Sequence, residues 1–425
     1  VQENLDFFGR LFGQSASARR TRIDELTRAT GLADFIDRPA MQLSGGMKQK
    51  LGVCCALIQD PDLLILDEPT TGVDPLSRRR FWQFIDRVRE RRPEISILVS
   101  TAYMEEAERF DTLAAMDAGR ILAVSSADDL RRRTGEADME AVFVALLPES
   151  RRHDHRLAGP SERQIVGQAS TAIRATGLTR RFGDFTAVDR LNLNIEAGEM
   201  FGFIGPNGAG KRTTIRFLAT LLKASRGEGI VNGYRVTADP MNVRRSVGYM
   251  PDSFGVYDGM KVWEFLDFFA VAYRISKSRR KAVITDVLEL LDLTHKRDDF
   301  VNGLSRGMKQ RLCLAKTLVH DPPVLILDEP ASGLDPRARL EVKALLKELR
   351  RMGKTILISS HILTELADCC TSIGIIERGQ LLMSGPIAEV YRRIRGNRVV
   401  EVKFTDKMDV GLSVIRSSPH CRNIQ

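Results

Sequence analysis

The chain has 425 residues, a formal net charge of +9, 43% hydrophobic residues and 28% charged residues. This length predicts two or three domains, and the composition is that of an ordinary globular protein. No apolar run approaches the roughly 18 residues that would indicate a membrane span. The modest positive charge permits contact with anionic lipid or nucleic acid but argues for neither. The six cysteines show no CxxC spacing, which indicates reduced, buried thiols.

The first predicted element is a helix, "VQENLDFF", whose apolar residues recur at helical spacing. The chain starts inside this pattern at Val1, without a methionine, and therefore looks like a fragment of a longer protein. A second helix is predicted to open at "LSGGM", with Ser44, Gly45 and Gly46 at its start. Backbone N–H groups at a helix N-terminus attract anions, although the same pattern also suits a plain helix cap. Because no lysine accompanies it, this site would complete a pocket whose phosphates are held elsewhere.

A buried strand, "LLILD", follows and ends in Asp67 and Glu68. An aspartate there suits a water-mediated magnesium contact, and the following glutamate suits a general base for an attacking water. The alternative is a pair of carboxylates that solvate a strand end. A further strand, "SILVS", precedes the segment "STAYM".

The stretch from residue 148 to residue 170 is polar and lacks helical or strand periodicity, so we interpret it as a linker. It separates a first unit, residues 1–147, from a second unit, residues 171–395. The tail, residues 396–425, contains one possible strand, "RVVEVKF".

In the second unit the strand Met200–Ile204 leads into "GPNGAGK", from Gly205 to Lys211, and then into a helix. Such glycines let backbone N–H groups face phosphate oxygens, while the lysine reaches the outer phosphates. Arg212 occupies the next position, where a small hydroxyl would hold a metal ion. Further candidate nucleotide contacts within and after the loop are Asn207, Gly208, Gly210, Thr213, which we assign to the α-phosphate, and Thr214.

A second acid pair, Asp328 and Glu329, ends another apolar strand, and we assign it the same metal and general-base roles. The two units repeat at a fixed register, which indicates homologous domains. "LSGGMKQKL" at Leu43 returns as "LSRGMKQRL" at Leu304, and "LILDEP" at Leu64 returns at Leu325, both 261 positions later. The same register would place a phosphate loop of the first unit about fifty residues before Val1, so we expect that domain to be incomplete. Short apolar strands alternate with amphipathic helices in both units, which predicts an α/β fold with a parallel sheet.

These motifs resemble the nucleotide-binding domains of ABC transporters over nearly the whole chain. "GPNGAGK" resembles the Walker A loop, "LILDEP" Walker B, and "LSGGM" the signature. "SGLDP", with Asp335, resembles the D-loop, "SSHIL", with His361, the switch loop, and Phe182 the aromatic residue that stacks on adenine. The resemblance implies the P-loop NTPase fold in two tandem domains, each with a helical signature subdomain, and it implies ATP and Mg²⁺ as cofactors.

The resemblance also implies two unequal ATP sites formed by head-to-tail pairing of the two units within the chain. One site joins Lys211 and the acids of the second unit to the "LSGGM" helix of the first. The other joins Asp67 and Glu68 to the second signature, where Arg306 replaces a glycine. Ala102 stands there at the switch position. Because an alanine cannot hydrogen-bond a γ-phosphate or order a water, we expect this second site to turn over slowly.

The second unit departs from the family pattern at two positions. Arg212 replaces the small hydroxyl residue after Lys211, and Asp252 replaces the metal-contacting glutamine. A guanidinium cannot ligate a cation. Arg212 either points away or lies along phosphate oxygens, and Asp252 either pairs with Arg212 or supplies an oxygen to the metal. We hypothesise that ATP binds through backbone amides and Lys211 while magnesium-dependent turnover is weakened. The rival is a local sequence change in a competent enzyme.

The "GGMKQ" and "GLDP" variants look most like the ABC-2 exporter branch. The resemblance implies a cytoplasmic ATPase subunit, peripheral on the inner face of the cell membrane, that powers separate permease subunits, with no nucleic acid partner. A soluble twin-cassette translation factor is an alternative, but "TGVDP" and "SGLDP" stand where "NHLD" is typical of that class. A nucleotide-binding regulator that does not hydrolyse is the other alternative, favoured by Arg212, Ala102 and Arg306.

Overall fold

The computed structural model describes residues 1–148 and 171–394, apart from residues 44, 72, 74, 118, 253, 254, 256, 258, 364, 365 and 367. The linker predicted over residues 148–170, beyond its first residue, and the tail over residues 396–425, with its predicted strand, lie outside the described residues. No helix among the described residues is long and apolar enough to cross a bilayer. The five described cysteines are buried and form no disulfide bond.

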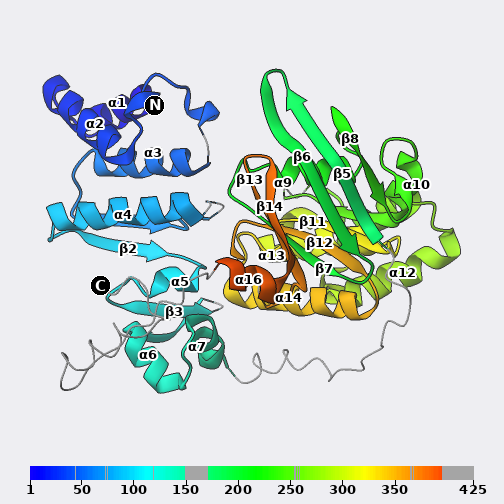
Figure 1. Ribbon diagram of the computed structural model, residues 1–425. Coiled ribbons are helices and arrows are strands. Elements are labelled where there is room, and N and C mark those ends of the chain that lie inside the picture. Colours follow the sequence, from blue (N-terminus) through cyan, green and yellow to red (C-terminus); the bar gives the residue numbers. More distant parts are fainter. Residues whose placement is uncertain are drawn as a thin grey trace, which may run out of the picture.

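The first unit, blue to teal in Figure 1, begins with helices and continues with two short strand pairs. Strands β1 and β2 pair in parallel, whereas β3 and β4 are antiparallel. The elements of this unit are α1 (Gln2–Leu11), α2 (Ala16–Thr30), η1 (Ala33–Phe35), η2 (Ala40–Gln42), α3 (Gly45–Leu57), β1 (Leu63–Asp67), α4 (Pro75–Arg91), β2 (Ser96–Ser100), α5 (Met104–Ala107), β3 (Leu113–Asp117), β4 (Arg120–Ser125), α6 (Ala127–Thr134) and α7 (Met139–Leu146).

The second unit, green to red in Figure 1, starts with antiparallel strands. Its elements are β5 (Thr171–Phe182), β6 (Phe185–Glu196), β7 (Met200–Ile204), α9 (Lys211–Leu218), β8 (Arg226–Val231), β9 (Tyr234–Arg235), α10 (Pro240–Ser246), β10 (Val247–Met250), α11 (Val262–Ala272), α12 (Lys277–Leu290), η4 (Thr294–Lys296), η5 (Val301–Gly303), α13 (Arg306–Leu318), β11 (Val324–Asp328), α14 (Pro336–Arg351), β12 (Thr355–Ser360), β13 (Ser372–Glu377), β14 (Gln380–Pro386) and α16 (Ile387–Ile394).

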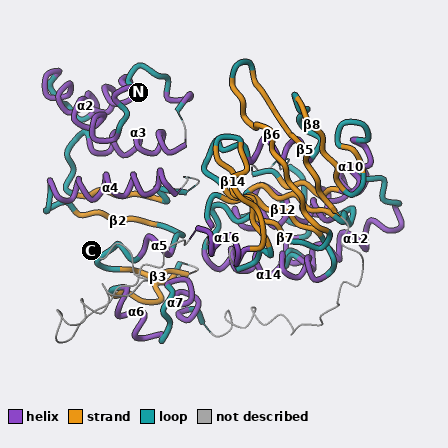
Figure 2. Tube along the Cα trace, in the orientation of Figure 1, coloured by secondary structure: helices purple, strands orange, loops and turns teal. Residues whose placement is uncertain are grey.

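Two sheets form the second unit, as the tube in Figure 2 shows. The central sheet has the order β10-β11-β12-β7-β13-β14, and all neighbours in it are parallel except β13 and β14. Every residue of β7, β11 and β12 is buried, which explains their unbroken apolar runs, because a parallel sheet is covered on both faces. The predicted α/β fold with a parallel sheet is confirmed.

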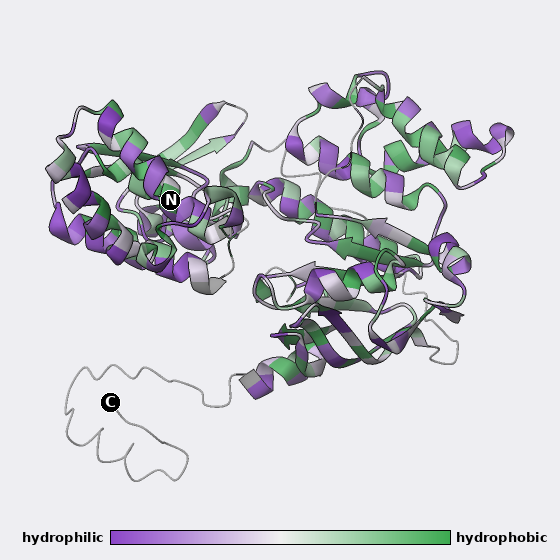
Figure 3. Ribbon diagram, turned by 90° about the horizontal axis from the view of Figure 1, so that it is seen from above, coloured by the Kyte–Doolittle hydropathy of each residue, from purple (hydrophilic) through white to green (hydrophobic). Residues whose placement is uncertain are grey.

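Two apolar clusters cover the two faces of this sheet. On one face, Phe201 and Phe203 of β7 and Phe217 of α9 pack with the second, antiparallel sheet, β6-β5-β8-β9. On the other face lie helices α11 to α14. In Figure 3, hydrophobic colours lie along the inner strands, and many hydrophilic residues lie along the outer helices. The phosphate loop, which follows β7, therefore starts from a strand fixed on both sides.

Among the described elements, the succession from α1 to α6 in the first unit matches that from α11 to α16 in the second, apart from α5, whose counterpart falls partly on residues outside the described ones. Helix α3 and strand β1 lie 261 positions before α13 and β11, as the sequence register predicts. After α4 the offset becomes 259, because the first unit has two more residues before β2. The pair Ile65–Leu98 of β1 and β2 corresponds to Ile326–Leu357 of β11 and β12.

The equivalent strands differ in what covers them. Leu63, Ile65 and Leu98 of the first unit are 53% to 64% exposed. Their counterparts Val324, Ile326 and Leu357 are at most 1% exposed, because they pack beneath the antiparallel sheet of the second unit. The described part of the first unit thus has an exposed apolar sheet face, whereas the equivalent face of the second unit is covered by that unit's own antiparallel sheet.

Candidate functional site

The loop between β7 and α9 has the backbone expected of a phosphate-binding turn. Gly208 and Gly210 have φ angles of +83° and +107°, which side chains rarely adopt. A Cβ at Gly205 would lie 2.3 Å from the carbonyl oxygen of Ile376, so only glycine fits there. Lys211 is 6% exposed, and its Nζ donates to the carbonyl oxygens of Gly205 and of Pro206, the latter at 3.1 Å. The loop therefore holds a buried ammonium beside backbone N–H groups, which suits a polyphosphate.

Other residues predicted to contact nucleotide surround this loop. Thr214 is fully buried and its hydroxyl donates to the Gly210 carbonyl oxygen at 3.1 Å, while Thr213 is half-buried. Asn207 is exposed. Phe182, at the end of β5, is 46% exposed, and the Arg180 guanidinium lies 4.5 Å from its ring centroid. Their nucleotide contacts stay predictions.

The second acid pair ends strand β11. Asp328 is 2% exposed; its Oδ1 accepts from the Ser359 hydroxyl at 2.6 Å, and that hydroxyl accepts from the Glu329 N–H at 2.9 Å. Because parallel strands place their carboxyl ends at one edge, Ser359 of β12 meets these acids directly. Burial raises the pKa of Asp328, and the Ser359 hydrogen bond and the Arg212 charge offset this only in part.

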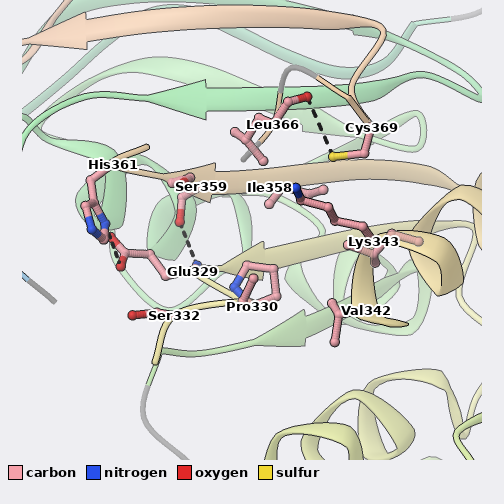
Figure 4. A pocket seen from close by; sticks show the side chains of 13 residues that line it. Glu329, Pro330, Ser332, Val342, Lys343, Ile358, Ser359, His361, Leu366 and Cys369 are labelled. Carbon is pink, nitrogen blue, oxygen red and sulfur yellow. Dashed lines mark hydrogen bonds and ion pairs between the residues drawn. The ribbon is translucent and has the colours of Figure 1, made fainter. Parts of the chain in front are cut away.

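Glu329 and His361 form a pair at the same sheet edge, in the cleft drawn in Figure 4. His361 Nδ1 lies 3.1 Å from Glu329 Oε2. Burial would raise the pKa of Glu329, but the His361 hydrogen bond and neighbouring positive charges lower it overall, so the carboxylate stays ionised. His361 Nε2 is buried and has no hydrogen-bond partner among the described residues, which leaves one ring nitrogen for a ligand atom. The predicted general base, Glu329, and the predicted phosphate contact, His361, therefore lie side by side.

Glu329 also has an unusual backbone, with a φ of +51°, and Glu68 of the first unit has a φ of +46°. Non-glycine residues seldom adopt this left-handed conformation, and the two glutamates share it at equivalent positions, 261 residues apart. Both glutamates directly follow a strand, and their positive φ turns the backbone away from the direction of that strand.

Arg212 bridges both carboxylates that the sequence predicts as metal contacts. Its Nε lies 3.2 Å from Asp328 Oδ2, and its Nη2 donates to Asp252 Oδ2. Burial would lower the pKa of Arg212, but the charges of Asp252 and Asp328 raise it overall, so the guanidinium remains cationic. The sequence left open whether Asp252 pairs with Arg212 or supplies an oxygen to the metal. The structure shows the pair with Arg212. The contact with Asp328, 116 positions away, is one that the sequence did not predict.

This donor set does not fit Mg²⁺. Magnesium requires about six oxygen ligands in octahedral geometry, whereas both candidate carboxylates contact a guanidinium, which has no acceptor atom. Among the residues that the structure describes, no three or more His, Cys, Asp or Glu side chains are grouped to hold a metal ion. Polyphosphate thus fits the residues of the second unit, and a divalent cation beside it does not.

In the acid pair of the first unit, the aspartate has the equivalent serine as its partner, but the glutamate has a different one. Asp67 is exposed and accepts from the Ser100 hydroxyl. Glu68 Oε2 accepts from the Thr71 hydroxyl at 2.5 Å, whereas the corresponding glutamate of the second unit meets a histidine. Ala102, at the switch position, brings no side-chain donor. The metal role of Asp67 and the catalytic role of Glu68 stay predictions.

The signature helices are only partly described. Ser44 lies outside the described residues, while Gly45 begins α3 and Gly46 is half-buried. In the second unit, the Ser305 hydroxyl caps α13 by accepting from the Met308 N–H at 3.3 Å, which is the plain-cap alternative. Asp335 likewise caps α14, since its carboxylate accepts from the Ala338 N–H at 2.9 Å. No ligand role of these residues is tested by these contacts.

One contact between the units was not predicted from the sequence. Arg339 of α14, just after the D-loop, donates to the Ala102 carbonyl oxygen at 3.5 Å. Its guanidinium also lies 5.3 Å from the ring centroid of Tyr103, and the Arg78 guanidinium lies 3.9 Å from the same centroid. Tyr103 is 4% exposed. In the sequence, only the aromatic residue Tyr103, directly after Ala102, could have indicated this contact.

Comparison with known proteins identifies the family. The ABC transporter family model matches residues 1–71 and 188–332. A probable multidrug ABC transporter ATP-binding protein of Escherichia coli, YbhF, is 31% identical over 91% of this chain and 77% of its own length. The chain belongs to the ABC transporter family. It is an ABC transporter ATP-binding protein, with the ATPase fold and activity of that family.

Two further relatives match a smaller part of the chain. The Nod factor export ATP-binding protein I of Rhizobium meliloti is 36% identical over 63% of this chain and 80% of its own length. The bacitracin transport ATP-binding protein BcrA of Bacillus licheniformis is 37% identical over 56% of this chain and 76% of its own length. A solved ATP-binding subunit of an ABC transporter is 31% identical, covers 53% of this chain and 94% of its own, and has a TM-score of 0.49.

Proposed function

We propose that this ATPase powers a separate membrane exporter of the ABC-2 type and lies peripherally on the cytoplasmic face of the membrane. The observation that carries its chemistry is the Glu329–His361 pair beside the Lys211 loop, because a base and a phosphate contact are what hydrolysis of a bound nucleotide requires. Relatives named for multidrug, Nod factor and bacitracin transport support the export role.

We further propose that the two units are two cassettes that pair within one chain. The contact of Arg339 with Ala102 and Tyr103 supports this, because it joins the D-loop region of one unit to the switch region of the other. The exposed Leu63, Ile65 and Leu98 of the first unit occupy strand positions whose counterparts in the second unit pack beneath its antiparallel sheet.

The two sites would be unequal. The site with Lys211, Asp328, Glu329 and His361 has a base held by an imidazole. The site with Asp67 and Glu68 has the Thr71 hydroxyl in that place. We propose that the second of these sites turns over slowly, since Ala102 brings no side chain that could order a water or hydrogen-bond a γ-phosphate.

Two measurements test the export role. Membrane subunits encoded with this chain are expected to co-purify with it, and their presence is expected to change its rate of phosphate release. The Lys211→Ala variant is the control, because it removes the loop ammonium and should abolish the response without abolishing co-purification. Failure of any membrane protein to co-purify with folded wild-type chain would refute the export role.

A regulator that binds nucleotide without hydrolysing it is the second candidate, and the Arg212 bridge across both acids favours it. A single-turnover assay with a limiting amount of radiolabelled ATP separates the two. Release of labelled phosphate that Glu329→Gln abolishes supports the ATPase, whereas recovery of intact ATP from the bound fraction supports the regulator.

A further inference from the structure

The Arg212 guanidinium lies where three distant segments of the second unit meet. Arg212 follows Lys211 at the start of α9, Asp328 ends β11, and Asp252 follows β10. Its Nε contacts Asp328 Oδ2 at 3.2 Å, and its Nη2 contacts Asp252 Oδ2. One planar cation thus connects the phosphate loop with the acid strand and with the segment after β10.

Both oxygens of Asp328 are engaged in this arrangement. Oδ1 accepts from the Ser359 hydroxyl at 2.6 Å and Oδ2 accepts from Arg212, and the side chain is 3% exposed. A cation that bound Asp328 would have to displace the guanidinium and then lie close to its positive charge. The exchange would replace a formed, partly buried ion pair, so the cluster selects against a divalent ion.

We propose that the second unit binds nucleoside triphosphate without a divalent cation, and that Arg212 supplies the charge that a metal would otherwise bring. This inference rests on the proposed nucleotide site at Lys211. Two cations, Lys211 and Arg212, then stand side by side at the N-terminus of α9 and neutralise phosphate charge together with the backbone N–H groups.

The exposure of Arg212 agrees with this role. Its side chain is 58% exposed although two carboxylates hold it, so part of the guanidinium is accessible to a ligand. Its Nη1 makes no hydrogen bond to any described residue, whereas Nε and Nη2 do. A planar group with two donors fixed and one left over is positioned to contact an oxyanion without moving.

The test is binding of methylanthraniloyl-ATP to the full chain, followed by fluorescence, in excess EDTA and in excess MgCl₂. The signal that Lys211→Ala removes defines this site and excludes other nucleotide sites. Arg212→Thr restores the small hydroxyl, and Arg216→Thr is the matched control, since it makes the same change one turn further along α9 at another exposed arginine. Circular dichroism checks folding, and Arg212→Gln serves as the second variant if Arg212→Thr fails to fold.

The expected result is that wild type and Arg216→Thr bind within about threefold in the two conditions, while Arg212→Thr binds at least about tenfold more weakly in EDTA and recovers in MgCl₂. Tenfold weakening of wild type by EDTA, or an Arg212→Thr variant indifferent to magnesium, would overturn the inference and leave the nucleotide site intact. Loss of all Lys211-dependent signal in both conditions would instead overturn the nucleotide site and the inference with it.

Discussion

The two units of this chain share one order of elements but differ in the residues around equivalent acids. Glu329 meets a buried imidazole, while Glu68 meets the hydroxyl of Thr71. Asp328 is buried in an ion pair with Arg212, while Asp67 is exposed. The comparison teaches that the strand and its acid pair follow from the fold, whereas the chemistry depends on side chains that other segments bring to them.

Glu329→Gln tests this contrast with the largest expected effect. A glutamine keeps the shape but cannot take a proton from water, so phosphate release should fall by about 10³-fold. Glu68→Gln is the matched control in the first unit, and it should change the rate by less than about threefold. Phosphate release by the purified chain measures both. Equal losses in the two variants would show that the units do not differ in the way proposed.

His361→Ala sharpens the same contrast through pH. Because the His361 hydrogen bond lowers the pKa of Glu329, its removal should raise that pKa, and the acidic limb of the rate profile should move to higher pH. The rate at neutral pH should fall by about 10²-fold. Thr71→Ala removes the corresponding donor to Glu68 and should leave the profile unmoved. An unshifted acidic limb in His361→Ala would contradict the proposed pairing.

Glu106→Gln tests how much a buried carboxylate stabilises the first unit. Glu106 is 3% exposed and accepts hydrogen bonds from Thr70 at 2.6 Å and from Trp82 and Thr101 at 2.8 Å, with Arg78 at 3.6 Å. Loss of its charge should reduce the free energy of unfolding of the first unit by about 2 kcal/mol.

The chain has two tryptophans, and Trp82 lies in the first unit. In a Trp263→Phe background, its fluorescence reports unfolding of the first unit in denaturant. Glu90→Gln, at an exposed position of α4, should leave the midpoint unchanged. A midpoint for Glu106→Gln equal to that of Glu90→Gln would mean that the buried cluster contributes nothing measurable.

Tyr103→Leu gives the smallest expected effect and addresses the contact between the units. Leucine keeps an apolar side chain but removes the ring that Arg339 approaches, so we expect a coupling of about 0.5–1 kcal/mol between the two residues. A double-mutant cycle with Arg339→Met, read by denaturant unfolding, measures it. A coupling of zero would remove the support that this contact gives to pairing within the chain.

Much of the second unit could be predicted from its sequence because local rules agree there. An apolar strand, a glycine-rich turn and a helix together specify the Lys211 loop, and the parallel strands bring Asp328, Ser359 and His361 to one edge. The family and the α/β fold followed from these motifs. Glycine at residue 205 has a tertiary reason, the approach of the Ile376 carbonyl, which no local pattern reveals.

The sequence limited the possible partners of Arg212 without deciding between them. A guanidinium cannot be a metal ligand, yet the motif was compatible with several positions of this long, flexible side chain. The choice depends on Asp252 and Asp328, which lie 40 and 116 positions away and are brought together by the sheet order. The Tyr103 contact was missed for the same reason, since it joins residues from two units.

The left-handed backbone at Glu329 and Glu68 has a consequence for design. A non-glycine residue at φ near +50° costs about 1–2 kcal/mol relative to glycine, which tolerates that geometry freely. Glycine at position 329 would therefore be expected to relieve this strain and stabilise the fold, while removing the proposed general base. Screens that select only for heat resistance would tend to erase the reactive carboxylate first.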